Sequence, residues 1–363
     1  MAIWAAVAVS TVAVLSLGGC SSLGYYWQSA AGHLSLMAAA RPVPAWLEDP
    51  QAPDRLKRQL ELSQRIRRFA SEELGLPDNP SYTRYADLRR PAVVWNVAAA
   101  PEFSLELYKW CFPVTGCVGY RGYFDEAAAQ AEAAEMRRQG YEAVVYPVPA
   151  YSTLGWMNWA GGDPLLNTFI QYPEGELARL IFHELAHQVL YVKNDMPFNE
   201  SFATAVERIG GEHYLRTQAS DTARREYAAY QARRLEFRAL VRATRQRLEA
   251  VYDAVGAAES RGSDEQRRRK DEVMRDFRAR YAAMRERWNA DPARLRLADR
   301  WVARANNASF GAQAAYDEFV PGFDALFERE GRDWARFYAA VRELAQEPRG
   351  VRRERLREME AGR

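Results

Sequence analysis

Residues 181–190 read Ile-Phe-His-Glu-Leu-Ala-His-Gln-Val-Leu and contain the pattern His-Glu-x-x-His at His183, Glu184 and His187. Residues four apart lie on the same face of an α-helix, so the two imidazoles can bind one metal ion together. Neutral histidine nitrogen is a good ligand for Zn²⁺, and the pattern therefore predicts one zinc ion here. Glu184 lies about 100° further round the helix, where it can act as a general base on a metal-bound water.

Chance is a weak explanation for this pattern, because histidine is rare in the chain. Only 4 of the 363 residues are histidine, and two of these four fall within the pattern. A random chain of this composition would contain roughly 0.004 such patterns. The alternative is a helix with two histidines that have only a structural role, and the residues that follow argue against it.

A catalytic zinc ion needs a third protein ligand and one open position. The helix that carries the histidines is expected to run from residue 176 to about 192, and Lys193-Asn194-Asp195-Met196-Pro197 has the composition of a turn. Asn199 is a good N-cap, which predicts a returning helix over residues 199–209 with Glu200 in its first turn. An antiparallel pair of helices would bring Glu200 to both histidines, so Glu200 is the predicted third ligand.

Two further side chains after the turn are candidates for a role at the metal site. His213 is a second candidate for the third ligand, less well placed than Glu200. Glu207 lies two turns after Glu200 on the same helix face. It is a candidate acceptor for the N–H of a ligand histidine, and an ordinary surface carboxylate is the alternative.

The first twenty residues are predicted to be a targeting segment rather than part of the fold. Residues 2–17 are an uncharged apolar run that ends in Leu17-Gly18-Gly19-Cys20. The run is short for a permanent anchor, since about 20 residues are needed to span a bilayer. The tetrapeptide resembles a bacterial lipobox, which implies removal of residues 1–19 and lipid on Cys20. The body would then face the periplasm from the outer membrane; an uncleaved anchor or a plain signal peptide is the alternative.

The other two cysteines fit an oxidising compartment. Five residues, Phe-Pro-Val-Thr-Gly, separate Cys111 from Cys117, and the proline and glycine favour a tight turn that brings the sulfurs together. An oxidising periplasm would keep the resulting disulfide, whereas a pair of buried thiols is the alternative.

Residue patterns divide the chain into five parts. The helical period recurs over residues 54–74, and a second helix follows a cap at Asp125. Short β-like runs are expected at residues 92–97, 118–124, 143–148 and 165–171. The predicted divisions are a signal peptide over 1–19, a tether and first helix over 20–45, a catalytic core over 46–214, a long helical hairpin over 215–290, and a C-terminal helical segment over 291–363.

Charge excludes nucleic acid as a partner. The net charge is only +2, from 50 basic and 48 acidic residues, so no global field attracts a polyanion. Arg267–Lys270 is a local basic run, but acidic residues are interleaved around it and no aromatic cluster accompanies it. A solvated helical face explains this run better. The oligomeric state has no sequence signal.

Two resemblances follow from these segments. His-Glu-Leu-Ala-His followed by Asn-Glu-Ser-Phe-Ala-Thr-Ala-Val-Glu resembles the gluzincin metallopeptidases, which implies Glu200 as the glutamate ligand. The segments Trp-Cys-Phe-Pro-Val-Thr-Gly-Cys-Val-Gly-Tyr-Arg-Gly-Tyr-Phe, Tyr-Ser-Thr-Leu-Gly-Trp and Asp-Pro-Leu-Leu-Asn-Thr, together with the helix pair, resemble a family of bacterial lipoproteins described as predicted aminopeptidases. This second resemblance spans residues 20–345. It implies a mostly helical α+β fold with a zincin-like core, and a zinc peptidase in the cell envelope.

A peptidase of this kind needs further groups, for which the sequence offers only candidates. Tyr151 and Tyr316 are candidate donors to the oxyanion. The strand expected at 165–171 is a candidate partner for an extended peptide substrate, and residues 151–156 are expected to line the same cleft. The carboxylate that an aminopeptidase uses to hold the substrate amine has three candidates: Asp163, Glu174 and Glu176.

Two other functions remain open at this stage. An endopeptidase would use the same zinc chemistry. A non-enzymatic envelope lipoprotein would hold a structural zinc and bind a partner through its helical arm. Structural zinc sites usually fill all four positions with protein ligands. The three candidate ligands and the free Glu184 therefore favour catalysis.

Overall fold

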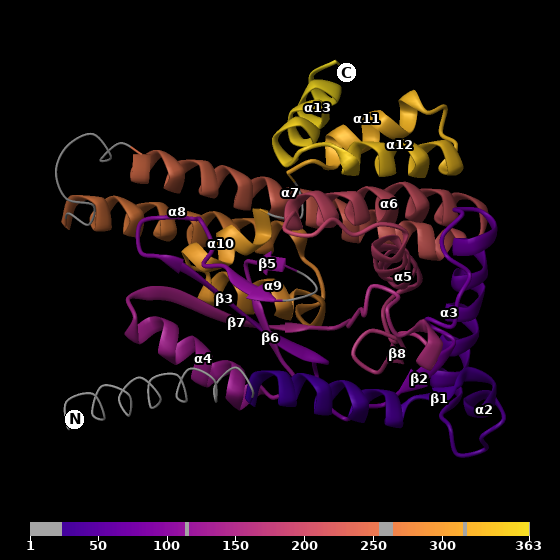
Figure 1. The fold of residues 1–363 in the computed structure, drawn as a ribbon. Helices are drawn as coiled ribbons and strands as arrows, with labels where there is room; N and C mark the ends of the chain where they lie inside the picture. Colours follow the sequence, from indigo (N-terminus) through magenta and orange to yellow (C-terminus); the bar gives the residue numbers. More distant parts are fainter. Residues whose placement is uncertain (1–23, 113–115, 254–263, 315–317, 363) are drawn as a thin grey trace, which may run out of the picture.

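The computed structural model describes residues 24–112, 116–253, 264–314 and 318–362 (Figure 1). The predicted signal peptide, the predicted lipidation site Cys20 and the candidate oxyanion donor Tyr316 lie outside these ranges. Among the described residues, no helix has the length and apolar character that a bilayer crossing requires. Helices dominate and the sheets are small, which confirms the predicted α+β, mostly helical fold class.

Three small sheets stand beside the helices. The first contains β6 (Arg121–Tyr123), β3 (Val94–Pro101) and β7 (Tyr141–Val148) in that order, all antiparallel. The second contains β1 (Arg41–Pro42), β2 (Arg84–Ala86) and β8 (Leu165–Leu166), with β2 and β8 parallel. The third is the hairpin of β4 (Trp110–Phe112) and β5 (Gly116–Val118).

The two faces of the central strand β3 have different neighbours, because successive side chains alternate between faces. Trp95, Val97 and Ala99 pack against α4 (Glu126–Arg138), whose N-terminus is capped by Asp125 as the sequence predicts. Ala98 and Ala100 pack on the opposite face against α10 (Asn307–Ala314). Asn96 shares this second face. One end of the face is therefore covered by a helix, and the other end faces the functional site described below.

The largest hydrophobic core surrounds two antiparallel helices, α5 (Glu174–Val189) and α6 (Met196–Thr217). Figure 1 shows α3 on one side of this pair and the C-terminal helices above it. The elements around the pair are α2 (Val43–Leu47), α3 (Asp54–Glu72), α11 (Val320–Arg329), α12 (Trp334–Gln346) and α13 (Arg349–Ala361). The metal-binding turn predicted from the sequence is thus at the centre of the best-packed part of the molecule.

Two long helices, α7 (Asp221–Asp253) and α8 (Asp264–Trp288), pack side by side and form a second core with α9 (Pro292–Arg304) and α10. The structure therefore has helices throughout the described part of the region where the sequence predicts a helical hairpin. The break expected near residues 256–263 lies outside the described residues. Figure 1 shows this pair extending away from α5 and α6 and lying above the β6-β3-β7 sheet.

Two expectations for local structure are wrong. The strand expected over 165–171 is reduced to the two residues of β8, since the amides of Phe169 and Ile170 both donate to the carbonyl of Leu166 and close a turn. The apolar residues of this segment are buried, and a strand of two residues is too short to pair with an extended substrate backbone. A short apolar run cannot reveal whether it is a strand or a buried turn. Asn199 is also not an N-cap, because α6 already begins at Met196.

Candidate metal centre

The helix pair α5 and α6 positions the predicted ligands. Phe182, Leu185 and Ala186 face the core, as do Phe202 and Val206 of α6. This packing leaves the face of α5 that carries the two histidines turned toward the first turns of α6. The side chain of Asn199 closes the connection between the helices: it accepts from the amide of Val192 and donates to the carbonyl of Val192, each at 2.8 Å.

His183, His187 and Glu200 form a group that could hold a metal ion, with one ligand atom from each residue and all three atoms within 4.8 Å of one another. The two Nε2 atoms are 3.1 Å apart. Oε2 of Glu200 lies 3.4 Å from Nε2 of His183 and 3.7 Å from Nε2 of His187. Two imidazoles and one carboxylate are a donor set that suits Zn²⁺ in catalytic sites. The residues therefore fit the predicted metal. His213 is not part of the group and packs edge to face against Phe69.

Glu207 lies behind His183, on the side away from the other ligands. Its Oε2 is 3.2 Å from Nδ1 of His183, close enough to hold the N–H on this nitrogen and leave Nε2 free for a metal. Its Oε1 contacts the guanidinium groups of Arg179 and Arg234. Arg179 is in turn hydrogen-bonded to Tyr227 of α7 at 2.7 Å. The orientation of His183 is thus linked to the long helical hairpin through a buried ion pair.

The charges of this group set the protonation of its members. Burial favours the neutral form of Glu207, but the positive charges of Arg179 and Arg234 and the hydrogen bond to His183 together outweigh it and hold the pKa of this carboxyl well below its usual range. Burial also opposes a charged imidazole at His183, whereas hydrogen bonds to Glu200 and Glu207 outweigh burial and raise its pKa. A metal that binds through His183 must therefore displace a proton, so its affinity falls as the pH is lowered.

Glu184 is turned into a large cleft beside the three ligands and is not one of them. The cleft has a volume of about 590 Å³, and His183, His187 and Glu200 also line it. Burial raises the pKa of Glu184, while the positive charges of the two histidines lower it in part. A carboxylate with a raised pKa next to a metal group is suited to accept and release a proton near neutral pH.

The rest of the cleft lining is rich in aromatic and polar groups. It includes Asn96 of the β3 face described above, Tyr120 just before β6, and Tyr191 just after α5. Burial, followed by the charge of Glu200, raises the pKa of Tyr120 well above its usual value, so its phenol stays protonated and can donate a hydrogen bond. Neither Tyr120 nor Tyr191 is among the residues predicted from the sequence. Nothing in the spacing of these residues indicates that they lie near the metal group.

The other predicted site residues have different positions. Tyr151 lines the cleft together with Ser152 and Leu154, and its ring packs on Phe124. Glu174 accepts a hydrogen bond from Tyr214 at 2.8 Å. Glu176 lines a neighbouring cavity of about 230 Å³ between α5, α6 and α7, which His183 and Glu184 also line.

Asp163, the third candidate for amine binding, is buried and supports the site from outside the cleft. It accepts hydrogen bonds from the backbone and hydroxyl of Thr153 and from Nε2 of Gln188. Burial raises its pKa to about 6, although the bonds from Thr153 oppose this shift. Gln188 follows the ligand His187 directly, so Asp163 connects the end of α5 to the loop that lines the cleft. None of the three candidate carboxylates lines the cleft itself.

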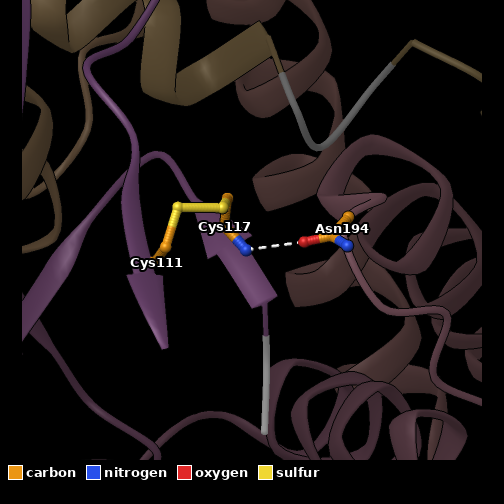
Figure 2. The surroundings of a disulfide bond; sticks show 3 residues. All are labelled: Cys111, Cys117 and Asn194. Atoms are coloured by element: carbon orange, nitrogen blue, oxygen red, sulfur yellow. Dashed lines mark hydrogen bonds between the residues drawn. A yellow bond between two sulfur atoms is a disulfide. The ribbon is translucent and has the colours of Figure 1, made fainter. Parts of the chain in front are cut away.

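The structure contains a disulfide between Cys111 and Cys117, which face each other across the β4–β5 hairpin. Figure 2 shows that the amide of Cys117 points toward Asn194, whose Oδ1 accepts its hydrogen bond at 2.7 Å. Asn194 lies between α5 and α6 and has a φ of +66°, a conformation that asparagine tolerates better than most residues. The hairpin that leads to Tyr120 is thereby joined to the connection between the two ligand helices.

Comparison with protein families gives a match. A family model described as "Putative aminopeptidase" matches residues 24–356, which is most of the chain. Searches of the curated proteins and of the solved structures found no match.

Proposed function

The chain belongs to the family described as "Putative aminopeptidase", and we propose that it is a zinc-dependent peptidase of the gluzincin type. One observation carries the proposal. Two imidazole Nε2 atoms and a carboxylate oxygen converge at one point, and Glu184 stands beside them, unligated, in a cleft large enough for a peptide. A structural zinc site would not need this fourth residue or an open cleft.

His183, His187 and Glu200 would hold the zinc ion. When bound, zinc supplies Lewis-acid chemistry, which lowers the pKa of a coordinated water and polarises a carbonyl group. Glu184 accepts the proton from the water at its carboxylate and returns it to the nitrogen of the leaving amine. Glu207 keeps the proton of His183 on Nδ1, so that Nε2 remains a ligand throughout.

Tyr120 is the best-placed donor for the oxyanion. Its phenol lines the cleft together with the three ligands and Glu184, and it remains protonated. A neutral donor directed at the position where negative charge develops stabilises the transition state. Tyr151 lines the same cleft and is the alternative proposed from the sequence. Substitution of each tyrosine by phenylalanine distinguishes them, since the donor is the one whose loss lowers kcat more than it changes KM.

An endopeptidase is the second candidate function, and one observation favours it. An aminopeptidase holds the free amine of its substrate, but Asp163 and Glu174 do not line the cleft, and Glu176 lines the neighbouring cavity instead. Among the described cleft residues, the carboxylates are those of Glu184 and Glu200, which already have roles. Rates on aminoacyl nitroanilides and on internally quenched peptides with blocked N-termini would distinguish the two activities.

The decisive experiment measures zinc content and peptide hydrolysis in the same preparations. We expect Glu184→Gln to keep one zinc per chain and to lose peptidase activity by a factor of about 10² or more, because the general base is removed. His187→Ala should lose both the metal and the activity. Glu212→Gln, an identical change at an exposed site on α6, is the matched control and should alter neither. Full activity of Glu184→Gln would contradict the proposed mechanism.

We also propose that the protein is a lipoprotein of the bacterial envelope, attached through Cys20 and facing the periplasm. The lipobox-like sequence at residues 17–20 supports this location, and the Cys111–Cys117 disulfide is typical of an oxidising compartment. Mass spectrometry of the N-terminal peptide from membrane fractions tests it. A mature chain that begins elsewhere than at Cys20 would exclude lipid attachment there.

A further inference from the structure

The first described helix, residues 24–39, has two very different sides. Its inner side packs on the fold: Leu36 is fully buried in the main core, and the ring of His33 lies against Tyr151. Its outer side exposes two large apolar groups, with 75% of Trp27 and 65% of Leu34 accessible, and Tyr26, which is 45% accessible, lies at the border between this side and the cleft. In Figure 1 this helix runs along the lower edge of the molecule, opposite α11–α13.

The composition of this helix sets it apart from the other exposed helices. Residues 24–39 contain no Asp, Glu, Lys or Arg, and the other exposed positions are small: Gly24, Ala30, Ala31, Ser35, Ala38 and Ala39. Leu297 of α9 is exposed to a similar extent, 62%, but stands between Arg296 and Asp299 in a strongly charged helix. Single exposed leucines are ordinary, whereas a continuous uncharged face marks an interaction surface.

We propose that the outer face of helix 24–39 lies on the surface of a lipid bilayer. The helix follows directly after the apolar run of residues 2–17, and four residues from Cys20 to Gly24 span at most about 14 Å. With the proposed lipid attachment at Cys20, the helix is held close to the membrane. Trp and Tyr prefer the boundary between headgroups and acyl chains, which fits the exposed side chains at its start.

Contact with the bilayer would depend on apolar burial more than on charge. The groove beside the helix is lined by Asp87, Arg90 and Asp125 together with Trp27 and Ala31. These three charged side chains include both signs, and the guanidinium of Arg90 donates a hydrogen bond to the carbonyl of Val93 at 2.9 Å. A surface without a cluster of cations gains little from anionic lipid, so the contact should persist at high salt.

The same helix borders the catalytic cleft, which gives its placement a consequence for the substrate. Tyr25, Tyr26 and Ser29 line the cleft beside the metal group. On the proposed function, the cleft opens next to the bilayer surface, and peptides bound to the membrane become the favoured substrate class. This consequence depends on peptidase activity, whereas the lipid contact does not.

The test uses the full chain in phosphatidylethanolamine–phosphatidylglycerol vesicles, with and without phosphatidylcholine brominated in its acyl chains. Bromine quenches tryptophan only at close contact. We expect the emission of wild type to fall in brominated vesicles, and Trp27→Phe to lose much of this quenched emission. Leu34→Trp should add emission that is quenched, while Leu297→Trp, at the matched exposed site on α9, should add emission that is not.

Equal quenching of the tryptophans added at positions 34 and 297, or no quenching at either, would overturn the proposal. Emission from position 34 that is shielded from both bromine and aqueous iodide would also overturn it, because the face would then be covered by protein. Leu34→Lys tests the substrate class, since it should slow hydrolysis of a vesicle-bound peptide and not of a soluble one. If wild type cleaves no peptide, the proposed function fails while the quenching result still stands.

Discussion

Glu207 decides how His183 presents its nitrogen to a metal, and its own charge is balanced by Arg179 and Arg234. Glu207→Gln keeps the shape but removes the charge that fixes the N–H on Nδ1. We expect zinc affinity to fall by about 10- to 100-fold, the usual cost of losing such a partner. Competition with a chromophoric chelator measures this affinity.

The same substitution leaves two arginines without a counter-charge in a buried site, so a loss of folding has to be separated from a loss of metal affinity. The free energy of unfolding of the metal-free variant provides this separation. Glu212→Gln is again the matched control, because Glu212 is exposed on the same helix. Unchanged zinc affinity in a folded Glu207→Gln protein would show that Glu207 does not orient His183.

Asp163 provides a pH dependence that can be measured without activity. Its pKa is raised from 3.8 to about 6 in the folded chain by burial. A raised pKa means that the stabilising proton is fully bound below about pH 4 and is lost as the pH rises through 6. The free energy of unfolding of wild type relative to Asp163→Asn should therefore fall by about 3 kcal/mol between pH 3.5 and 7. A difference that does not change with pH would contradict the shift.

Asn199 determines how helix α5 connects to helix α6. Its side chain bonds both the amide and the carbonyl of Val192, which fixes the start of the helix that carries Glu200. We expect Asn199→Ala to lower the free energy of unfolding by about 2 kcal/mol, since two buried hydrogen bonds are lost. Zinc affinity should fall as well, because Glu200 is the next residue.

Thr217→Ala is the control for this change. It removes an exposed hydrogen bond to the carbonyl of His213 at the other end of α6, and it should change stability by less than about 0.5 kcal/mol. Chemical denaturation followed by circular dichroism measures both variants. Equal effects of the two substitutions would mean that the connection does not depend on Asn199.

The elements that carry the ligands could be predicted from the sequence because their signals are local. A spacing of four residues places His183 and His187 on one face, and an antiparallel return is the simplest way to reach Glu200. The start of α6 could not be predicted in the same way. Asn199 has the residue type of an N-cap, but its side chain bonds back to Val192 and the helix begins earlier, at Met196. The hydrogen bonds to Val192 therefore determine which of two roles the Asn199 side chain has, that of an N-cap or that of a link to the preceding connection.

The residues that line the cleft could not be predicted from the sequence, for a different reason. Tyr120 precedes a three-residue strand and reaches the metal group only because β6, β3 and β7 assemble next to α5. No local period or spacing relates Tyr120 to His183, which is 63 positions later in the chain. Asp163 is the opposite case. Its position in the sequence suggested that it binds the substrate amine, but its hydrogen bond from Thr153 indicates that it supports the loop there. Long-range assembly, not residue type, gives these side chains their neighbours.

For the whole molecule, the metal group joins two helices that belong to the largest core, so metal binding should stabilise the entire fold. A ligand that binds only the folded state adds about 2.7 kcal/mol at 100 times its dissociation constant. We expect zinc to raise the melting temperature of the chelator-treated protein by roughly 5 °C. Glu184→Gln should show the full increase and His187→Ala none, because only His187 is a ligand. Differential scanning calorimetry with and without zinc measures this increase. An equal rise in His187→Ala would place the binding elsewhere and remove the physical basis for the proposed site, since Glu184 would then have no metal beside it.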